Sequence, residues 1–151
     1  MTIETRQLGF VNVGEADIIR FPHGIYGFEK ARRFVLLGDK KEAQNPFLWL
    51  QSVDGREPCF AVIDPRAFFG RYDPPLTRED RLAIGLDDEK YLRYVVLATV
   101  PRDVRRLSFN LKCPVIVNSQ RNIAMQVILD DPAYPIRYYP FAGETGAPSC
   151  L

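Results

Sequence analysis

Short apolar runs, separated at close intervals by turn-forming residues, are the feature that most limits what this chain can fold into. The 12 prolines and 10 glycines among its 151 residues leave little room for long helices. The runs are rich in Val, Ile, Leu and aromatic residues, which is typical of strands in an antiparallel, mainly β protein. We expect strands over residues 3–8, 18–21, 34–37, 47–52, 59–63, 91–100, 107–118 and 123–129.

Turn and cap residues refine this prediction. The last two runs predict a hairpin, because residues 119–122 join them and Asn122 tolerates the left-handed backbone of such a connection. Pro114 cannot donate a ladder hydrogen bond, so we expect an edge position or a bulge there. A short helix is expected from Thr77, with an acid at Asp80 and Gly85 as its end, and a single helical turn over 28–33. Residues 64–76 are expected to form an irregular loop that carries aromatic side chains.

Length and composition predict one globular domain. With 46% hydrophobic residues, the chain can bury a sizeable core. We expect the domain over residues 1–142, and a flexible C-terminal tail over 143–151, where residues are small and almost uncharged.

The cysteines and the apolar runs predict a cytoplasmic protein. Three cysteines cannot all pair within one chain, and residues 1–20 lack the apolar centre of a secretory signal. The densest apolar stretch, residues 94–100, is far shorter than the about 20 residues that cross a bilayer. No membrane partner is expected.

Charge gives no indication of a nucleic-acid partner. The formal net charge is +1 and the isoelectric point is about 7.7, whereas dedicated nucleic-acid-binding domains often exceed about 9. One basic stretch remains, with Arg102, Arg105, Arg106 and Lys112 offset by Asp103. It is either a solvated loop or a contact for phosphate or an acidic partner.

Candidate catalytic and metal-binding residues are few, so we do not expect an enzyme. The single histidine, His23, lies beside Pro and Gly in a predicted turn. No Cys-x-x-Cys or paired histidine spacing predicts a metal site, and no phosphate-binding loop motif occurs. Cys59 and Cys113 lie in apolar runs and are expected to be buried thiols, and Trp49 is expected in the core. No cofactor is expected.

Several segments, taken in order, resemble the flagellar assembly factor FliW family. The early segment Phe21-Pro22-His23-Gly24-Ile25-Tyr26-Gly27-Phe28 looks like the family's Phe-Pro-x-Gly-Ile-x-Gly-Phe turn. The other matching segments are residues 34–37, 46–52, 60–65, 110–118 and 126–129, followed by Tyr134 and Arg137. The similarity covers about residues 1–138, and Cys113 stands where the family more often has Ala.

This resemblance implies a small β-barrel-like protein that acts by binding rather than by catalysis. Members of the family bind flagellin, the filament subunit, and CsrA, an RNA-binding translational repressor. The factor freed by flagellin export is thought to capture CsrA and so relieve repression of flagellin messenger RNA. The resemblance therefore implies partner switching, with no direct nucleic-acid contact and a free monomer.

Aromatic side chains near loops and termini are the candidate contacts, because such residues often anchor protein interfaces. They are Tyr26, Phe68, Phe69, Tyr72, Tyr138, Tyr139 and Phe141. Arg102, Arg105 and Arg106 form a second candidate group, facing an acidic partner surface. Each aromatic could instead plug an end of the barrel.

Two other functions remain open on the residues alone. The first is a direct RNA-binding β-barrel module that uses residues 102–112 with Phe109. The second is a hydrolase with Cys59 as nucleophile and His23 as base.

Overall fold

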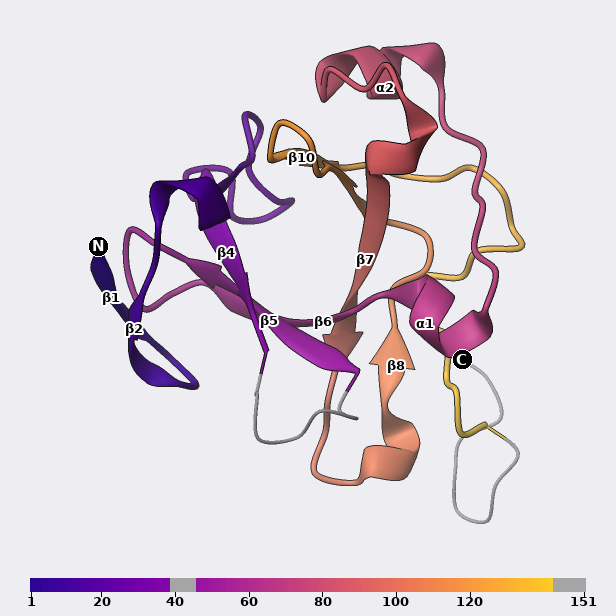
Figure 1. The fold of residues 1–151 in the computed structure, drawn as a ribbon. Coiled ribbons are helices and arrows are strands. Elements are labelled where there is room, and N and C mark those ends of the chain that lie inside the picture. Colours follow the sequence, from indigo (N-terminus) through magenta and orange to yellow (C-terminus); the bar gives the residue numbers. More distant parts are fainter. Residues whose placement is uncertain (39–45, 143–151) are drawn as a thin grey trace.

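A computed structural model describes residues 1–38 and 46–142 and shows a mainly β domain (Figure 1). Its strands are β1 (Thr2–Thr5), β2 (Gly9–Asn12), β3 (Ile19–Arg20), β4 (Arg33–Leu37), β5 (Phe47–Ser52), β6 (Cys59–Ile63), β7 (Leu92–Thr99), β8 (Ser108–Phe109), β9 (Val115–Asn118) and β10 (Ile123–Gln126). Its α-helices are α1 (Pro65–Phe69) and α2 (Arg78–Ala83), and single 3₁₀ turns occupy Glu15–Asp17, Glu89–Tyr91 and Val104–Arg106.

The main sheet curls into a ring. Its strand order is β6-β5-β4-β3-β10-β9-β7-β8, and β6 also pairs with β7, which closes the ring. This closing contact matches Val62 with Leu97 and Ile63 with Val96. All pairings are antiparallel except β3 with β10, which are parallel and meet at one position, Arg20 beside Ile123. The expected mainly β single domain is confirmed, with a ring-like sheet in place of a strict barrel.

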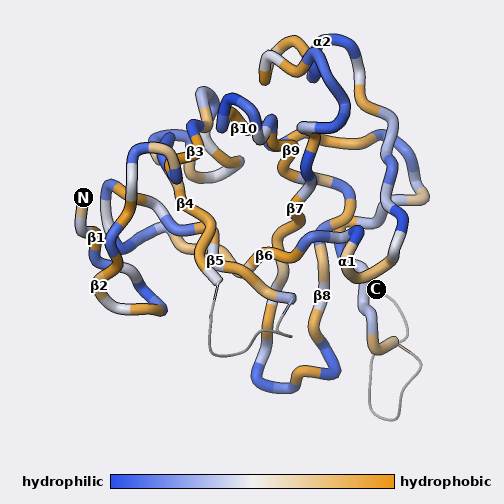
Figure 2. The backbone as a smooth tube through the Cα atoms, in the orientation of Figure 1, coloured by the Kyte–Doolittle hydropathy of each residue, from blue (hydrophilic) through white to orange (hydrophobic). Residues whose placement is uncertain are grey.

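Apolar side chains fill the ring from two sides. One cluster centres on Phe34 and Phe21, whose rings meet edge to face at 4.9 Å between centroids. A second centres on Phe109, Tyr94 and Ile116 and lies under α1 and the C-terminal segment. The hydropathy colouring in Figure 2 shows the strands as apolar stretches and the β7–β8 connection as mainly hydrophilic. The ring therefore presents its polar residues mostly on loops.

The N-terminal residues form a hairpin of β1 and β2, whereas a single strand was expected over residues 3–8. A turn breaks this run, because the Thr5 hydroxyl donates to the Gly9 carbonyl at 2.6 Å and accepts from the Leu8 N–H at 2.9 Å. The hairpin packs beside β4, where Ile3 and Val13 contact Val35 in a small separate cluster.

The expected strand over residues 107–118 is two strands. β8 ends at Phe109 and β9 begins at Val115, directly after Pro114. Between them the Asn110 side chain accepts a hydrogen bond from the Cys113 N–H at 3.0 Å and holds a turn. The ladder is interrupted at Pro114 as expected, but as a break between two strands and not at an edge position, because β9 pairs with both β7 and β10. The hairpin of β9 and β10 is also confirmed, with Asn122 at a φ of 52°.

Helix α2 matches the prediction, since Thr77 and Asp80 exchange the reciprocal hydrogen bonds of a capping box. The helical turn expected over 28–33 is wrong. Ile25 and Phe28 instead form an isolated β-bridge before β4. Gly24 and Gly27, which precede these two residues, both have a positive φ.

The irregular loop expected over residues 64–76 contains α1. The Asp64 side chain accepts from the Arg66 N–H, Pro65 occupies the first turn, and Gly70 at φ 74° ends the helix. Each of these residues suits its position at a helix end, so the signal was present in the sequence.

Trp49, expected in the core, is half-buried, as are Cys59 and Cys113. Side chains alternate along a strand, and the neighbouring Leu48 and Leu50 pack into the ring's interior. Trp49 therefore faces outward.

Candidate partner-binding surface

Most of the candidate contact residues meet at one end of the ring, which we call the hairpin end: the β7–β8 connection (residues 100–107), β8, α1 and residues 134–142. Figure 1 shows α1, β8 and the described C-terminal segment side by side. The backbones of Phe109 and Tyr138 exchange two hydrogen bonds, each 2.8 Å long. This pairing places the C-terminal segment along β8.

Helix α1 places Phe68 and Phe69 on this end. Their rings pack edge to face at 5.1 Å, and Phe68 meets the fully buried Phe109 at the same distance. Phe69 also meets Tyr138 at 5.1 Å. Phe68 keeps 41% of its surface exposed, while Phe69, Tyr138, Tyr139 and Phe141 are partly buried. Phe68 thus offers the largest free aromatic area of the group.

Tyr72 has the contacts of a packing residue. It is only 4% exposed, and its hydroxyl donates to the Leu111 carbonyl at 2.9 Å. Its ring lies edge to face with Tyr94 and Tyr134 at 5.2 and 5.4 Å. Burial raises the pKa of the Tyr72 phenol, so its proton stays on the oxygen that donates this bond.

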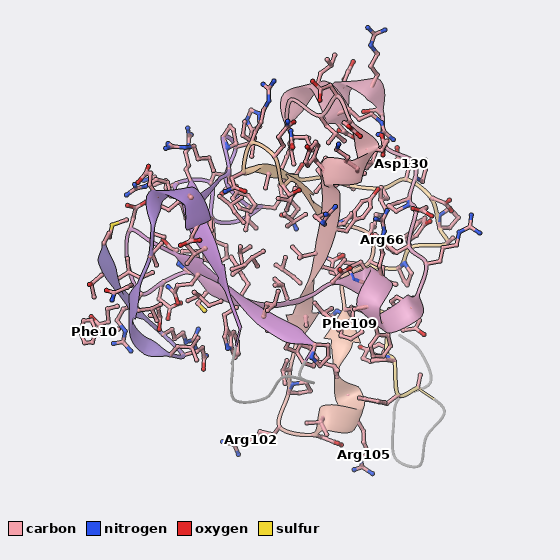
Figure 3. The ribbon with its side chains drawn as sticks, viewed as in Figure 1. Phe10, Arg66, Arg102, Arg105, Phe109 and Asp130 are labelled. Atoms are coloured by element: carbon pink, nitrogen blue, oxygen red, sulfur yellow. The ribbon has the colours of Figure 1, made fainter. Side chains whose placement is uncertain are left out.

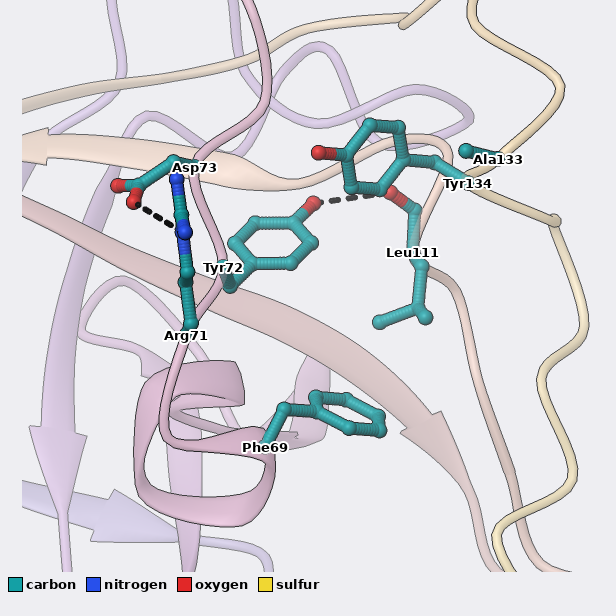
Figure 4. Close-up of a pocket in the computed structure, with 7 residues that line it drawn as sticks. All are labelled: Phe69, Arg71, Tyr72, Asp73, Leu111, Ala133 and Tyr134. Atoms are coloured by element: carbon teal, nitrogen blue, oxygen red, sulfur yellow. Dashed lines mark hydrogen bonds and ion pairs between the residues drawn. The ribbon is translucent and has the colours of Figure 1, made fainter.

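The Tyr72 side chain borders a surface pocket of about 370 Å³ (Figure 4). Phe69, Leu111 and Tyr134 form apolar parts of its wall, and the ion pair of Arg71 with Asp73 lies at one side. In the same segment, the Arg66 guanidinium lies 4.8 Å from the centre of the Tyr94 ring and pairs with Asp73 at 2.9 Å. These contacts hold residues 66–73 against β7.

The three candidate arginines lie on the β7–β8 connection, but they differ in what they contact. Arg105 pairs with Asp103, Nε to Oδ1, at 3.0 Å, and its hydrogen bonds lower the pKa of that carboxyl. Arg102 and Arg106 are exposed and form no ion pair with any residue the structure describes. Figure 3 shows Arg102 and Arg105 pointing outward from the end of the molecule.

A small groove of about 200 Å³ lies between this connection and the C-terminal segment. It brings together two candidate residues, Arg106 and Tyr139, with Arg137. Thr99, Pro101 and Ser108 complete its lining.

Tyr26 lies elsewhere on the ring. Its side chain is 58% exposed in the turn before β4, and its backbone N–H donates to the Gln126 side chain at 3.0 Å. It borders a different pocket, with His23 and Met125.

The exposed apolar residues that sequence reasoning did not single out include Phe28, Val100, Val104 and Ile136, which are 45, 53, 61 and 58% exposed. Val100 and Val104 lie near the candidate arginines in sequence, and Ile136 lies next to Arg137. The sequence did not indicate that these residues are exposed, because an apolar residue next to a predicted strand is ordinarily assigned to the core.

The residues of the hydrolase hypothesis lie in different settings. Cys59 is in β6 opposite Gln51, and burial raises the pKa of its thiol, which opposes formation of the nucleophilic thiolate. His23 lies in the turn beside Tyr26. Among residues 1–38 and 46–142, no three His, Cys, Asp or Glu side chains gather in a way that could hold a metal ion.

The fold and this surface define a small β-ring protein whose aromatic and arginine side chains gather at one end. A family model described as "FliW protein" matches residues 2–140. The chain belongs to the FliW family.

Its relatives are flagellar assembly factors. The chain is 36% identical over 138 residues to the flagellar assembly factor FliW of Caldanaerobacter subterraneus subsp. tengcongensis, covering 91% of both chains. It is 38% identical over 139 residues to that of Ruminiclostridium cellulolyticum, covering 92% of this chain and 93% of the relative.

A solved structure, "Crystal structure of the flagellar assembly factor FliW", superposes with a TM-score of 0.84 at 29% identity, covering 92% of this chain and 96% of the other. Within the part of this chain that the structure describes, no helix has the length and apolar character needed to cross a membrane.

Proposed function

We propose that this protein is a cytoplasmic flagellar assembly factor that binds flagellin and CsrA in turn. By capturing CsrA when flagellin is exported, it antagonises CsrA repression of flagellin messenger RNA translation. It acts by binding and not by catalysis, and it is a monomer when free. The observation that carries this proposal is the family match over residues 2–140.

The hairpin end supports a role in protein binding. Phe68 is exposed over a buried aromatic cluster, and Val104 and Ile136 are exposed near arginines. Aromatic and arginine side chains are the residue types that most often supply binding energy at protein interfaces. The net charge of +1 is compatible with a protein partner as the direct contact.

Partner switching needs only competition. If flagellin and CsrA cannot be bound together, the flagellin concentration sets the amount of free factor by mass action. If this protein binds CsrA at a site outside the RNA groove and CsrA then releases its RNA, the two sites on CsrA are coupled.

Calorimetry tests the proposal. The protein is titrated into the CsrA of its own organism, with and without flagellin monomer. We expect a Kd of about 1 µM or lower, which corresponds to about −8 kcal/mol, and loss of the signal when flagellin is present. Absence of a complex with either partner would overturn the proposal.

A mobility shift with RNA alone separates this function from the direct RNA-binding alternative. We expect no shift of RNA without CsrA. A shift with steep salt dependence would instead favour the RNA-binding module.

Alanine variants test the contact residues. We expect Phe68→Ala and Tyr139→Ala to weaken binding of at least one partner by about tenfold, the equivalent of about 1.4 kcal/mol. Tyr26→Ala tests the candidate contact residue that lies away from the hairpin end. Folded variants at all three positions that bind both partners normally would refute this choice of residues.

A further inference from the structure

The groove between the β7–β8 connection and the C-terminal segment joins two arginines that are distant in sequence. Arg106 comes from the 3₁₀ turn before β8, and Arg137 from the segment that pairs with β8 through Tyr138. Thr99, Ser108 and Tyr139 line the same groove of about 200 Å³, so residues with hydroxyl side chains border it together with the two arginines.

These two arginines are available for a partner. Within the described residues, neither Arg106 nor Arg137 makes an ion pair or a side-chain hydrogen bond, whereas the neighbouring Arg105 is held by Asp103. Arg106 acts on Asp103 only through space, behind Arg105. Ser108 is 7% exposed, and its hydroxyl has no hydrogen-bond partner in the described part of the chain. The groove therefore has donors and positive charge to spare.

Exposed apolar residues also lie near the groove. Val100, Val104 and Ile136 each lie next to or near a groove-lining residue in sequence and are exposed by 53, 61 and 58%. An acidic segment that also carries apolar side chains complements both features. A polyanion would gain little from these apolar side chains and would need a longer line of basic contacts than two arginines supply.

We propose that the groove between Arg106 and Arg137 binds a carboxylate side chain of an acidic, partly apolar segment of a protein partner. A guanidinium offers two parallel N–H donors that match a carboxylate, so two arginines on facing walls can hold one carboxylate or two successive ones. The assignment deepens the proposed function and rests on it for the partner being a protein.

Neutralising the groove tests this in the partner assays. The double variant Arg106→Gln/Arg137→Gln removes both guanidinium groups that line the groove. Arg78→Gln, an exposed arginine at the start of α2, is the distant control. Thermal unfolding midpoints equal to wild type establish that the variants fold.

We expect the double variant to weaken binding of flagellin or CsrA at least about tenfold and to flatten its salt dependence, with the Arg78→Gln control within about twofold of wild type. An unchanged affinity for both partners, or an equal loss in Arg78→Gln, would overturn the assignment.

A probe that needs neither partner separates this inference from the proposed function. Side-chain Nε and backbone amide signals are followed by NMR while the capped peptide Leu-Asp-Leu-Glu is added, and then its amide analogue Leu-Asn-Leu-Gln. We expect the acidic peptide alone to shift the signals of Arg106, Arg137 and Ser108. If the wild-type protein binds neither flagellin nor CsrA but shows these shifts, the proposed function is wrong and the assignment of the groove as a carboxylate-binding site is retained.

No shift with the acidic peptide, or equal shifts with its amide analogue, would overturn the carboxylate assignment. If an RNA oligonucleotide shifts the groove signals at a lower concentration than the peptide does, the proposal that the groove binds a protein partner would be overturned.

Discussion

Three buried amide side chains hold loops to the ring. The Gln51 amide accepts from the Arg6 N–H at 3.1 Å and donates to carbonyls of the loop after β5. The Asn118 amide donates to the carbonyls of Ile84 and Gly85 at 2.9 and 3.1 Å. The Gln126 amide joins the Tyr26 N–H to the Cys113 carbonyl. All three lie in segments that resemble the family's, so these segments include residues that build the fold.

Asn118→Ala is expected to lower the free energy of unfolding by about 2 kcal/mol, because two carbonyls at the end of α2 lose a buried donor. Chemical denaturation measures this change. Gln120→Ala, an exposed residue of the adjacent turn, is the control and should stay within about 0.5 kcal/mol of wild type. Equal effects at the two positions would contradict the role assigned to Asn118.

Tyr72 predicts how stability depends on alkaline pH. Its folded pKa is raised by burial above the usual value of about 10, so the folded state keeps this proton longer than the unfolded chain. The stabilisation is complete below about pH 10 and is lost as the pH rises above that value. Burial raises the pKa of Tyr94 as well and acts in the same direction.

Tyr72→Phe should therefore reduce the loss of stability above about pH 10, while costing about 1–2 kcal/mol at neutral pH because the Leu111 carbonyl loses its donor. Denaturation at several pH values measures both effects. Tyr26→Phe, at an exposed position elsewhere on the ring, serves as the control. A pH profile unchanged by Tyr72→Phe would refute the argument.

At the scale of an element, the turn between β3 and β4 depends on two glycines with different surroundings. Gly24 has a φ of +66°, and a Cβ there would lie 2.6 Å from the Glu29 Cα. Gly27 has a φ of +88°, but a Cβ there would meet nothing within 4 Å. The two positions separate backbone strain from steric collision.

Gly27→Ala is expected to cost about 1–2 kcal/mol, the usual penalty of a left-handed backbone for a residue with a Cβ. Gly24→Ala should cost clearly more, since the backbone at Glu29 must also move. Denaturant midpoints compare the two variants. If Gly24→Ala were the milder change, the packing of this turn would have to be different.

At the scale of the whole molecule, the ring has seams of unequal strength. β4 and β5 match at four residue pairs, whereas the parallel strands β3 and β10 match at one. Two further hydrogen bonds support that seam, from the Arg20 N–H to the Asn122 carbonyl at 2.9 Å and from the Asn122 amide to the Ala16 carbonyl at 2.7 Å. The ring should open first between β3 and β10.

Native-state hydrogen exchange tests this order of opening. The Arg20 amide is expected to exchange through a smaller opening free energy than amides of β5, because few contacts hold its seam. Asn122→Ala, which strains a φ of 52° and removes the bond to Ala16, should widen the difference. Equal protection of the Arg20 amide and the β5 amides would contradict the prediction that the β3–β10 seam opens first.

Local signals in the sequence account for much of the fold. β5 and β6 have the predicted bounds, Thr77 and Asp80 cap α2 as expected, and the β9–β10 hairpin turns at Asn122. In each case neighbouring residues supply the energy that decides the structure. The helix at Asp64-Pro65 was missed although its cap residues were visible, because the prolines and aromatics around it favoured an irregular loop.

The sequence by itself determined that this chain forms short strands around an apolar core, which residues cap its helix and turns, and which family it resembles. Only the tertiary structure decided that β6 meets β7, that one strand pair is parallel, that Tyr72 is buried, and that Arg106 faces a groove with Arg137. The reason is physical: strand-forming and capping preferences act between residues close in the chain, whereas ring closure and shared burial join segments whose separation no local pattern encodes.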